Sequence, residues 1–62
     1  MPVVTIQMLE GRSVEQKRQL VEAITRAMVE IARAKPEAVE VVIQEVPSTN
    51  WARSGKLLSD QQ

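Results

Sequence analysis

Residues 3–9 alternate between apolar and polar side chains with the period of two that is typical of a β-strand. The apolar positions of one face are Val4, Ile6 and Met8. The polar residues Thr5 and Gln7 fall on the other face. Because successive side chains of a strand point to opposite faces, the alternation predicts a strand with one face toward a core. The run Glu10-Gly11-Arg12 then ends this pattern.

Residues after Arg12 change to helical spacing and predict a helix that runs to about Ala34. Ser13 and Gln16 have the spacing of a capping box, in which each side chain bonds the backbone N–H of the other residue. The apolar positions expected in the core are Leu20, Ile24, Ala27, Met28 and Ile31. The charged positions expected on the solvent side are Arg18, Glu22, Arg26 and Glu30. Pro36 should end the helix, because proline cannot continue it.

Residues 39–46 predict a second strand, which Pro47 ends. Its centre, residues 41–43, is apolar without interruption, as is typical of a strand covered on both faces. Residues 47–56 predict a loop or hairpin. The pair Leu57-Leu58 is expected to form one short strand, and residues 60–62 are expected to form a frayed tail.

Strand, helix and strand in this order make one β-α-β unit, an α+β fold within a single domain of residues 1–62 that ends in a short hairpin. The crossover should be right-handed and the two strands parallel. A two-stranded sheet has two bare edges and an uncovered face. We therefore expect the sheet to be extended by dimerisation with a second copy.

The composition agrees with an oligomer of small subunits. The chain has 62 residues and no cysteine, and folding at this length buries only about 60% of the unfolded surface. Without disulfides, such a chain is expected to gain stability by assembling with other copies. The 8 basic and 8 acidic residues cancel, which argues against nucleic-acid partners and polybasic membrane binding. No apolar run approaches a membrane span and no signal peptide opens the chain, so we expect a cytoplasmic protein.

The candidate chemistry is limited because the chain contains neither histidine nor cysteine. This excludes a Ser-His-Asp triad and the usual zinc ligands within one chain. Removal of Met1 is expected before the small residue Pro2, and it would leave a secondary amine. Ordinary α-amino groups have a pKa of about 8, and both an apolar site and a nearby arginine disfavour the protonated form. Such an amine suits proton abstraction, although a proline also suits the plain start of a strand.

Pro2 precedes an alternating strand, and this strand leads into Leu9-Glu10-Gly11-Arg12-Ser13 and then Glu15-Gln16-Lys17. The order closely resembles the 4-oxalocrotonate tautomerase family, which opens with Pro, a strand and Leu-Glu-Gly-Arg-(Ser/Thr)-x-Glu-Gln-Lys. Residues 50–60 also resemble the C-terminal loop and hairpin of this family. The resemblance covers essentially the whole chain. It implies the β-α-β fold described above, assembled as a homohexamer, a trimer of dimers.

The resemblance implies an isomerase, a keto–enol tautomerase of aromatic catabolism that needs no cofactor and no metal. Its substrate would be a small carboxylate, either a 2-hydroxy-dienoate or an enol-pyruvate acid. Pro2 matches the general base, and Arg12 matches the arginine that binds a substrate carboxylate, for which a guanidinium offers a bidentate fork. Trp51 stands where the family has an aromatic residue, often Phe, that lines an apolar pocket.

The sequence departs from the family pattern at Glu40, where the best-studied members have a second arginine. A carboxylate cannot bind an anion, and this departure weakens the expected preference for a dicarboxylate such as 2-hydroxymuconate. Arg53 either supplies the missing positive charge or is a solvent-exposed loop arginine. Both readings of Arg53 stay open at this point.

Two alternatives to a tautomerase also stay open. One is a hydratase that resembles the dehalogenase and decarboxylase relatives. In it, a protonated Pro2 would act as the acid, and a carboxylate would activate water. Glu40 is the candidate for this carboxylate. The other is a non-catalytic subunit of a hetero-oligomer. Retention of Met1 would favour the latter, because the Pro2 nitrogen is then a tertiary amide. The presence of Pro2, Arg12 and Trp51 in family register argues against it.

Overall fold

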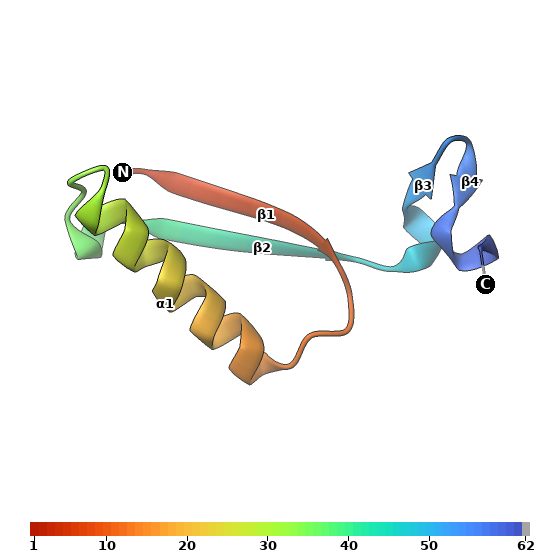
Figure 1. Cartoon of the computed structure of the whole chain (residues 1–62), viewed down its shortest axis with the longest axis horizontal. Coiled ribbons are helices and arrows are strands. Elements are labelled where there is room, and N and C mark those ends of the chain that lie inside the picture. The colour runs from red at the N-terminus through yellow and green to blue at the C-terminus, as the bar shows by residue number, and fades with distance from the viewer. Residues whose placement is uncertain (62) are drawn as a thin grey trace.

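The chain folds as a β-α-β unit followed by a small hairpin (Figure 1). In this computed structural model, which describes residues 1–61, the elements are β1 (Val3–Leu9), α1 (Val14–Glu30), β2 (Glu40–Val46), β3 (Ala52–Arg53) and β4 (Lys56–Leu57). Three short 3-10 turns lie at Pro36–Ala38, Ser48–Asn50 and Leu58–Asp60. The predicted α+β class, with two strands around one helix and a C-terminal hairpin, is confirmed.

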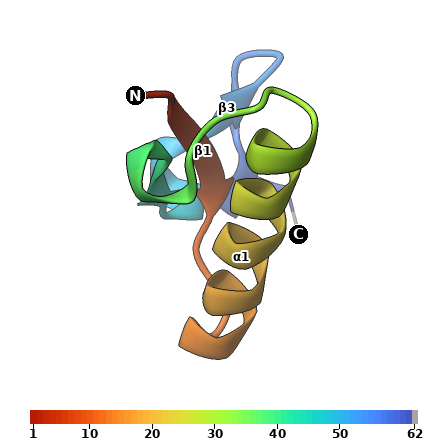
Figure 2. The ribbon, with the colours of Figure 1, turned by 90° about the vertical axis from the view of Figure 1, so that its left-hand side faces the viewer.

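The two long strands pair in parallel, with Val3 opposite Glu40 at one end and Leu9 opposite Val46 at the other. Figure 2 shows α1 on one side of this sheet. The face that carries the half-buried residues Val4, Ile6 and Met8 packs toward the helix, as the alternation predicts.

The opposite face of the sheet is open in the single chain. Val3 is 49% exposed and Val42 is 45% exposed. Gln7 and Gln44 face each other on this side, and the amide nitrogen of Gln7 donates to the amide oxygen of Gln44 at 3.1 Å. The expectation that the centre of β2 is covered on both faces is therefore not met within one chain. Its apolar character requires cover from outside the chain.

The start of α1 agrees with the predicted capping box. The Ser13 hydroxyl accepts from the Gln16 N–H at 3.1 Å, and the Gln16 side-chain oxygen accepts from the Ser13 N–H at 2.9 Å. These bonds satisfy two backbone donors that the first helical turn would otherwise leave unpaired. An ion pair of 2.7 Å between Lys17 and Glu45 then connects the helix to β2.

The helix ends at Glu30, which is earlier than the predicted end near Ala34. Arg33 adopts a left-handed backbone with φ of 61°, and the Ala34 N–H turns back to the Met28 carbonyl at 3.2 Å. The chain thus reverses before it reaches the proline. Ile31, predicted to lie in the core, is 82% exposed, because it caps the helix rather than lying on its packed face.

The C-terminal residues form a tighter structure than the sequence predicts. Ser54 and Gly55 both have positive φ, 54° and 78°, which is the pattern of a two-residue type I′ turn. Leu57 pairs with Ala52, but Leu58 begins a 3-10 turn instead of extending the strand. This turn includes Asp60, which we expected to fray, whereas Gln62 lies outside the described residues.

The hairpin projects from the β-α-β unit as an arm, residues 48–61, seen at the right of Figure 1. Its main contacts join its own strands and turns. The Cα radius of gyration is 14.7 Å, whereas a compact chain of this length would have about 10.6 Å. No side chain in residues 1–61 is fully buried. Over the same residues, no helix has the length and apolar character needed to cross a membrane.

Candidate active site

Pro2 lies at the end of the sheet where both long strands begin, which we call the amino end. Its carbonyl accepts a hydrogen bond from the Glu40 N–H at 3.0 Å. Because β1 and β2 are parallel, the residues that precede the two strands lie at this same end. The topology therefore brings Pro2 close to the segment of residues 34–40, although 32 residues or more separate them in sequence.

A hollow of about 320 Å³ opens at the amino end. Besides Met1, its lining residues are Pro2, Met28, Ala32, Ala34, Lys35 and Ala38. The walls come from the last turn of α1 and from the connection to β2, and they are small or apolar except for Lys35. With Met1 attached, the Pro2 nitrogen is part of a peptide bond and has no basic lone pair.

Arg12 lies beyond the other end of β1, at the end of the sheet that we call the carboxyl end. Gly11 directly before it has φ of 131°, a conformation that residues with a side chain rarely adopt. The Arg12 guanidinium donates to the Leu9 carbonyl at 3.3 Å. Within residues 1–61 no carboxylate lies within ion-pair distance of it. Arg12 also lines a hollow of about 200 Å³ with Met8 and Leu20, so its charge is available to an anion there.

Trp51 also lies at the carboxyl end, where β2 leads into the arm. It is half-buried and lines a hollow of about 300 Å³ together with Gln7 and Val46. Its carbonyl accepts from the Leu58 N–H at 2.8 Å, which ties the start of the arm to its end. Trp51 is thus held by the backbone of the arm while its ring stays accessible.

Arg53 is exposed in β3, opposite Lys56 on β4. No carboxylate within residues 1–61 forms an ion pair with it. The two neighbouring cations give the arm local positive charge. Within one chain, however, Arg53 does not line the hollow at Pro2.

One chain does not bring the predicted site residues together. Pro2 lies at the amino end, whereas Arg12 and Trp51 lie at the carboxyl end. The seven residues of β1 separate the two ends, which at ~3.3 Å per residue is about 23 Å. A site that uses all three residues therefore needs the carboxyl end of another chain. No motif in the sequence marks Lys35 as a site residue, although the parallel order of the strands already implies that it lies near Pro2.

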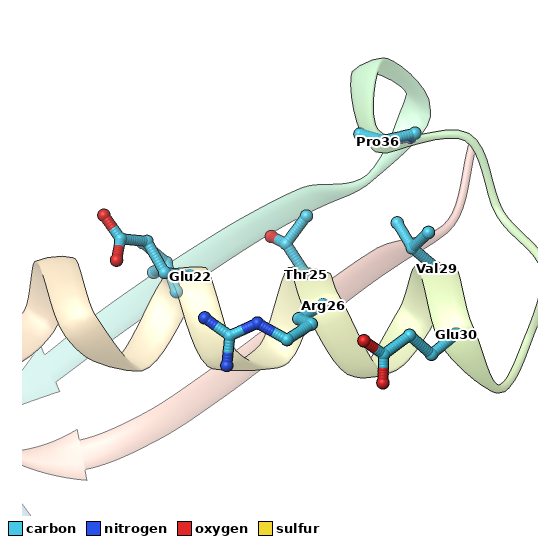
Figure 3. Close-up of a pocket in the computed structure, with 7 residues that line it drawn as sticks. Glu22, Thr25, Arg26, Val29, Glu30 and Pro36 are labelled. Atoms are coloured by element: carbon cyan, nitrogen blue, oxygen red, sulfur yellow. The ribbon is translucent and has the colours of Figure 1, made fainter.

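A further hollow, of about 440 Å³, lies elsewhere (Figure 3). Figure 3 shows Val29, Thr25 and Pro36 around it, with charged residues of α1 beside them. It contains none of the predicted site residues. In addition, residues 1–61 hold no group of three or more carboxylates that could bind a metal ion. The residues suited to proton transfer and anion binding thus lie at the two ends of the sheet.

Comparison with known proteins identifies the fold and the family. A family model described as a tautomerase enzyme matches residues 2–61. A probable tautomerase of Halalkalibacterium halodurans is 49% identical over 61 residues, which cover 98% of this chain and 100% of the relative. A 2-hydroxymuconate tautomerase of Bacillus subtilis is 48% identical over 62 residues, with complete coverage of both chains.

Solved structures agree with these sequence matches. YwhB, a homologue of 4-oxalocrotonate tautomerase, has a TM-score of 0.95 at 48% identity, covering 98% of this chain and 100% of the other. A heterohexameric 4-oxalocrotonate tautomerase from Chloroflexus aurantiacus J-10-fl has a TM-score of 0.92 at 37% identity, with complete coverage of both chains. Since sequence and fold agree from Pro2 through the turn after the hairpin, the chain belongs to the tautomerase family of isomerases.

Proposed function

We propose that the chain, once Met1 has been removed, converts the enol form of a small 2-hydroxy acid to its keto form without a cofactor. The observation that carries this proposal is the hollow at Pro2, which small and apolar residues line and which leaves room for a small substrate beside the amine. The substrate named for the Bacillus subtilis relative, 2-hydroxymuconate, is our first candidate. A small water-soluble acid also suits a reaction in the cytoplasm, where we place it.

In the proposed reaction, the Pro2 nitrogen accepts the proton of the substrate 2-hydroxyl group. The electron pair left on oxygen forms the carbonyl, and the conjugated electrons shift along the chain. The same nitrogen, now protonated, delivers its proton to a carbon atom. No atom is gained or lost. A base whose pKa lies near the working pH performs both transfers efficiently.

We propose that Arg12 of a neighbouring chain binds the substrate carboxylate and that Trp51 excludes water from the reacting atoms. A two-fold axis between two copies of β1 would extend the sheet with antiparallel strands. Such pairing lays the amino end of one chain against the carboxyl end of the other. This arrangement supports a shared site, because it reduces the separation of about 23 Å that one strand of seven residues imposes.

We expect no folded monomer at micromolar concentration and propose a homohexamer, a trimer of dimers. The physical reason is that one chain buries none of its described side chains fully and leaves Val3 and Val42 about half exposed. The assembly of the Chloroflexus aurantiacus enzyme as a heterohexamer supports the number of subunits. Analytical ultracentrifugation together with circular dichroism checks this expectation. A helical species that sediments at 6.9 kDa would contradict it.

The function is tested by supplying three substrates to a preparation of the chain whose intact mass shows that Met1 is absent. We expect ketonisation of 2-hydroxymuconate and phenylenolpyruvate, which is measured as the loss of the enol absorbance. A 3-haloacrylate should release no halide. Halide release without ketonisation would instead indicate a hydratase. That second candidate rests on one observation, namely that the Glu40 N–H donates to the Pro2 carbonyl, which holds the start of β2 beside Pro2.

No turnover of any of the three substrates by the processed chain would contradict an autonomous enzyme. It would favour the reading of the chain as a subunit of a hetero-oligomer. The retained-Met1 form is not a valid test of this point, because its Pro2 nitrogen is an amide. Intact mass must therefore accompany each assay.

A further inference from the structure

Among the described residues that line the hollow at Pro2, Lys35 is the one with a charged side chain. The other walls, apart from Met1 and Pro2, are methionine and alanine side chains contributed by α1 and by the connection to β2. We propose that Lys35 binds a carboxylate of the substrate in this hollow and so forms an anion subsite in the same chain as Pro2. The inference deepens the proposed function and rests on it for the identity of the substrate.

The backbone of Lys35 is held in place on both sides. Pro36 follows it, and a residue before proline is restricted to extended conformations; Lys35 has φ of −77° and ψ of 137°. Its carbonyl also accepts from the Ala38 N–H at 2.9 Å. The base of the side chain is therefore fixed beside the hollow, while the four-carbon stem lets the ammonium group adjust to a ligand.

Within residues 1–61, the Lys35 ammonium forms no ion pair that would compete with a ligand. Over residues 1–61, the only ion pairs are Lys17 with Glu45 and Arg18 with Glu15. Glu40 donates its backbone N–H to the Pro2 carbonyl, and its position in register with Val3 puts its side chain on the open face of the sheet. The hollow has Met28 and Ala32, on the helix side of the sheet, among its walls. The Glu40 side chain therefore lies on the opposite face of the sheet from the hollow.

An anion is the ligand that fits this charge. The ammonium group offers three donors and no acceptor, and a charge beside apolar walls attracts an opposite charge more strongly than it would in bulk water. A neutral ligand would leave the ammonium without a counter-charge. Small enol acids carry at least one carboxylate, and alanine side chains leave room for such a molecule beside Pro2.

Lys35 also bears on the number of carboxylates that the site accepts. With Glu40 in place of an arginine and Arg53 on the projecting arm, the cations of the amino end are Arg33 and Lys35. Of these two, only Lys35 lines the hollow. A dicarboxylate could then bind Arg12 of a neighbouring chain with one carboxylate and Lys35 with the other. A monocarboxylate can use only one of these two charges.

The experiment compares Lys35→Gln and Lys35→Arg with the parent chain and with Arg18→Gln. Arg18 is a matched control, because its loss changes the net charge by the same amount and it lies on the solvent side of α1, 58% exposed. We expect Lys35→Gln to raise the KM for 2-hydroxymuconate about tenfold or more, the size typical of a lost charge-assisted bond. Its kcat should change little, and phenylenolpyruvate should be affected less. Lys35→Arg should keep the parent KM.

A second measurement does not depend on turnover. Titration calorimetry with cis,cis-muconate, a dicarboxylate that has no enol to convert, should show the same loss of affinity in Lys35→Gln and none in Arg18→Gln. An unchanged KM and an unchanged muconate affinity in Lys35→Gln would overturn the subsite. Equal losses in Lys35→Arg and Lys35→Gln would also overturn it, because charge would then not be the cause. If the processed parent chain binds muconate but converts no enol, the proposed function fails while the subsite stands.

Discussion

A chain that retains Met1 is expected to convert 2-hydroxymuconate about 10²- to 10⁴-fold more slowly than the processed chain, the range typical of losing a general base. The retained residue turns the Pro2 nitrogen into an amide, which cannot accept the substrate proton. Met1 itself is 80% exposed, so its presence should not disturb packing within the chain. Steady-state kinetics on two preparations, one with and one without Met1 by intact mass, measure the effect.

The variant Pro2→Ala provides the control for this prediction. After removal of Met1 it still has an α-amino group, but a primary one on a less restricted backbone. Its turnover should fall below that of the parent and stay above that of the Met1-retaining chain. The sedimentation of all three forms should be the same. Equal kcat in the processed and unprocessed preparations would exclude the Pro2 nitrogen as the base.

Arg12→Ala is expected to lower kcat/KM by about 10- to 150-fold, which corresponds to roughly 1.5–3 kcal/mol of lost charge-assisted hydrogen bonding. The fold should tolerate this change, because the exposed guanidinium has only a 3.3 Å bond to the Leu9 carbonyl within residues 1–61. Kinetics on 2-hydroxymuconate and phenylenolpyruvate measure the loss. Arg18→Ala is the control, since exposed ion pairs contribute only about 0–1 kcal/mol.

Mixing two impaired chains tests whether the site is shared between copies. One partner retains Met1 and has an intact Arg12; the other is the processed Arg12→Ala chain and has a free Pro2. After the two are unfolded and refolded together, a site that combines the free Pro2 with the intact Arg12 should recover activity. If the subunits of a dimer mix at random, roughly a quarter of the sites are complete. Activity no higher than that of the separate variants would show that Arg12 does not act across a chain interface.

Local sequence signals predicted the elements of the fold well, because each signal acts over a few residues. The alternation in residues 3–9 specifies a strand, and β1 spans Val3–Leu9. The Ser13 and Gln16 pair specifies the start of the helix through two hydrogen bonds. The end of the helix was predicted less well. Proline indicates only where a helix cannot continue, whereas the left-handed turn at Arg33 ends α1 several residues earlier.

The apolar pattern also predicted too much burial within one chain. Ile31 has helical spacing from Ile24 and Met28, yet it lies past the packed part of the helix and is exposed. The uninterrupted apolar centre of β2 predicted cover on both faces, whereas Val42 remains 45% exposed. An apolar pattern indicates that a side chain is shielded from water, but it does not indicate whether the same chain or another chain covers that side chain.

For this protein, the sequence by itself determined the order of elements, the family resemblance and the types of residue available for chemistry, because these depend on local propensity and residue identity. Only the tertiary structure decided where those residues lie. The parallel pairing of β1 and β2 puts Pro2 and Lys35 at one end of the sheet and Arg12 and Trp51 at the other. That separation arises from the length of the strand, a distance in space that residue spacing along the chain does not reveal.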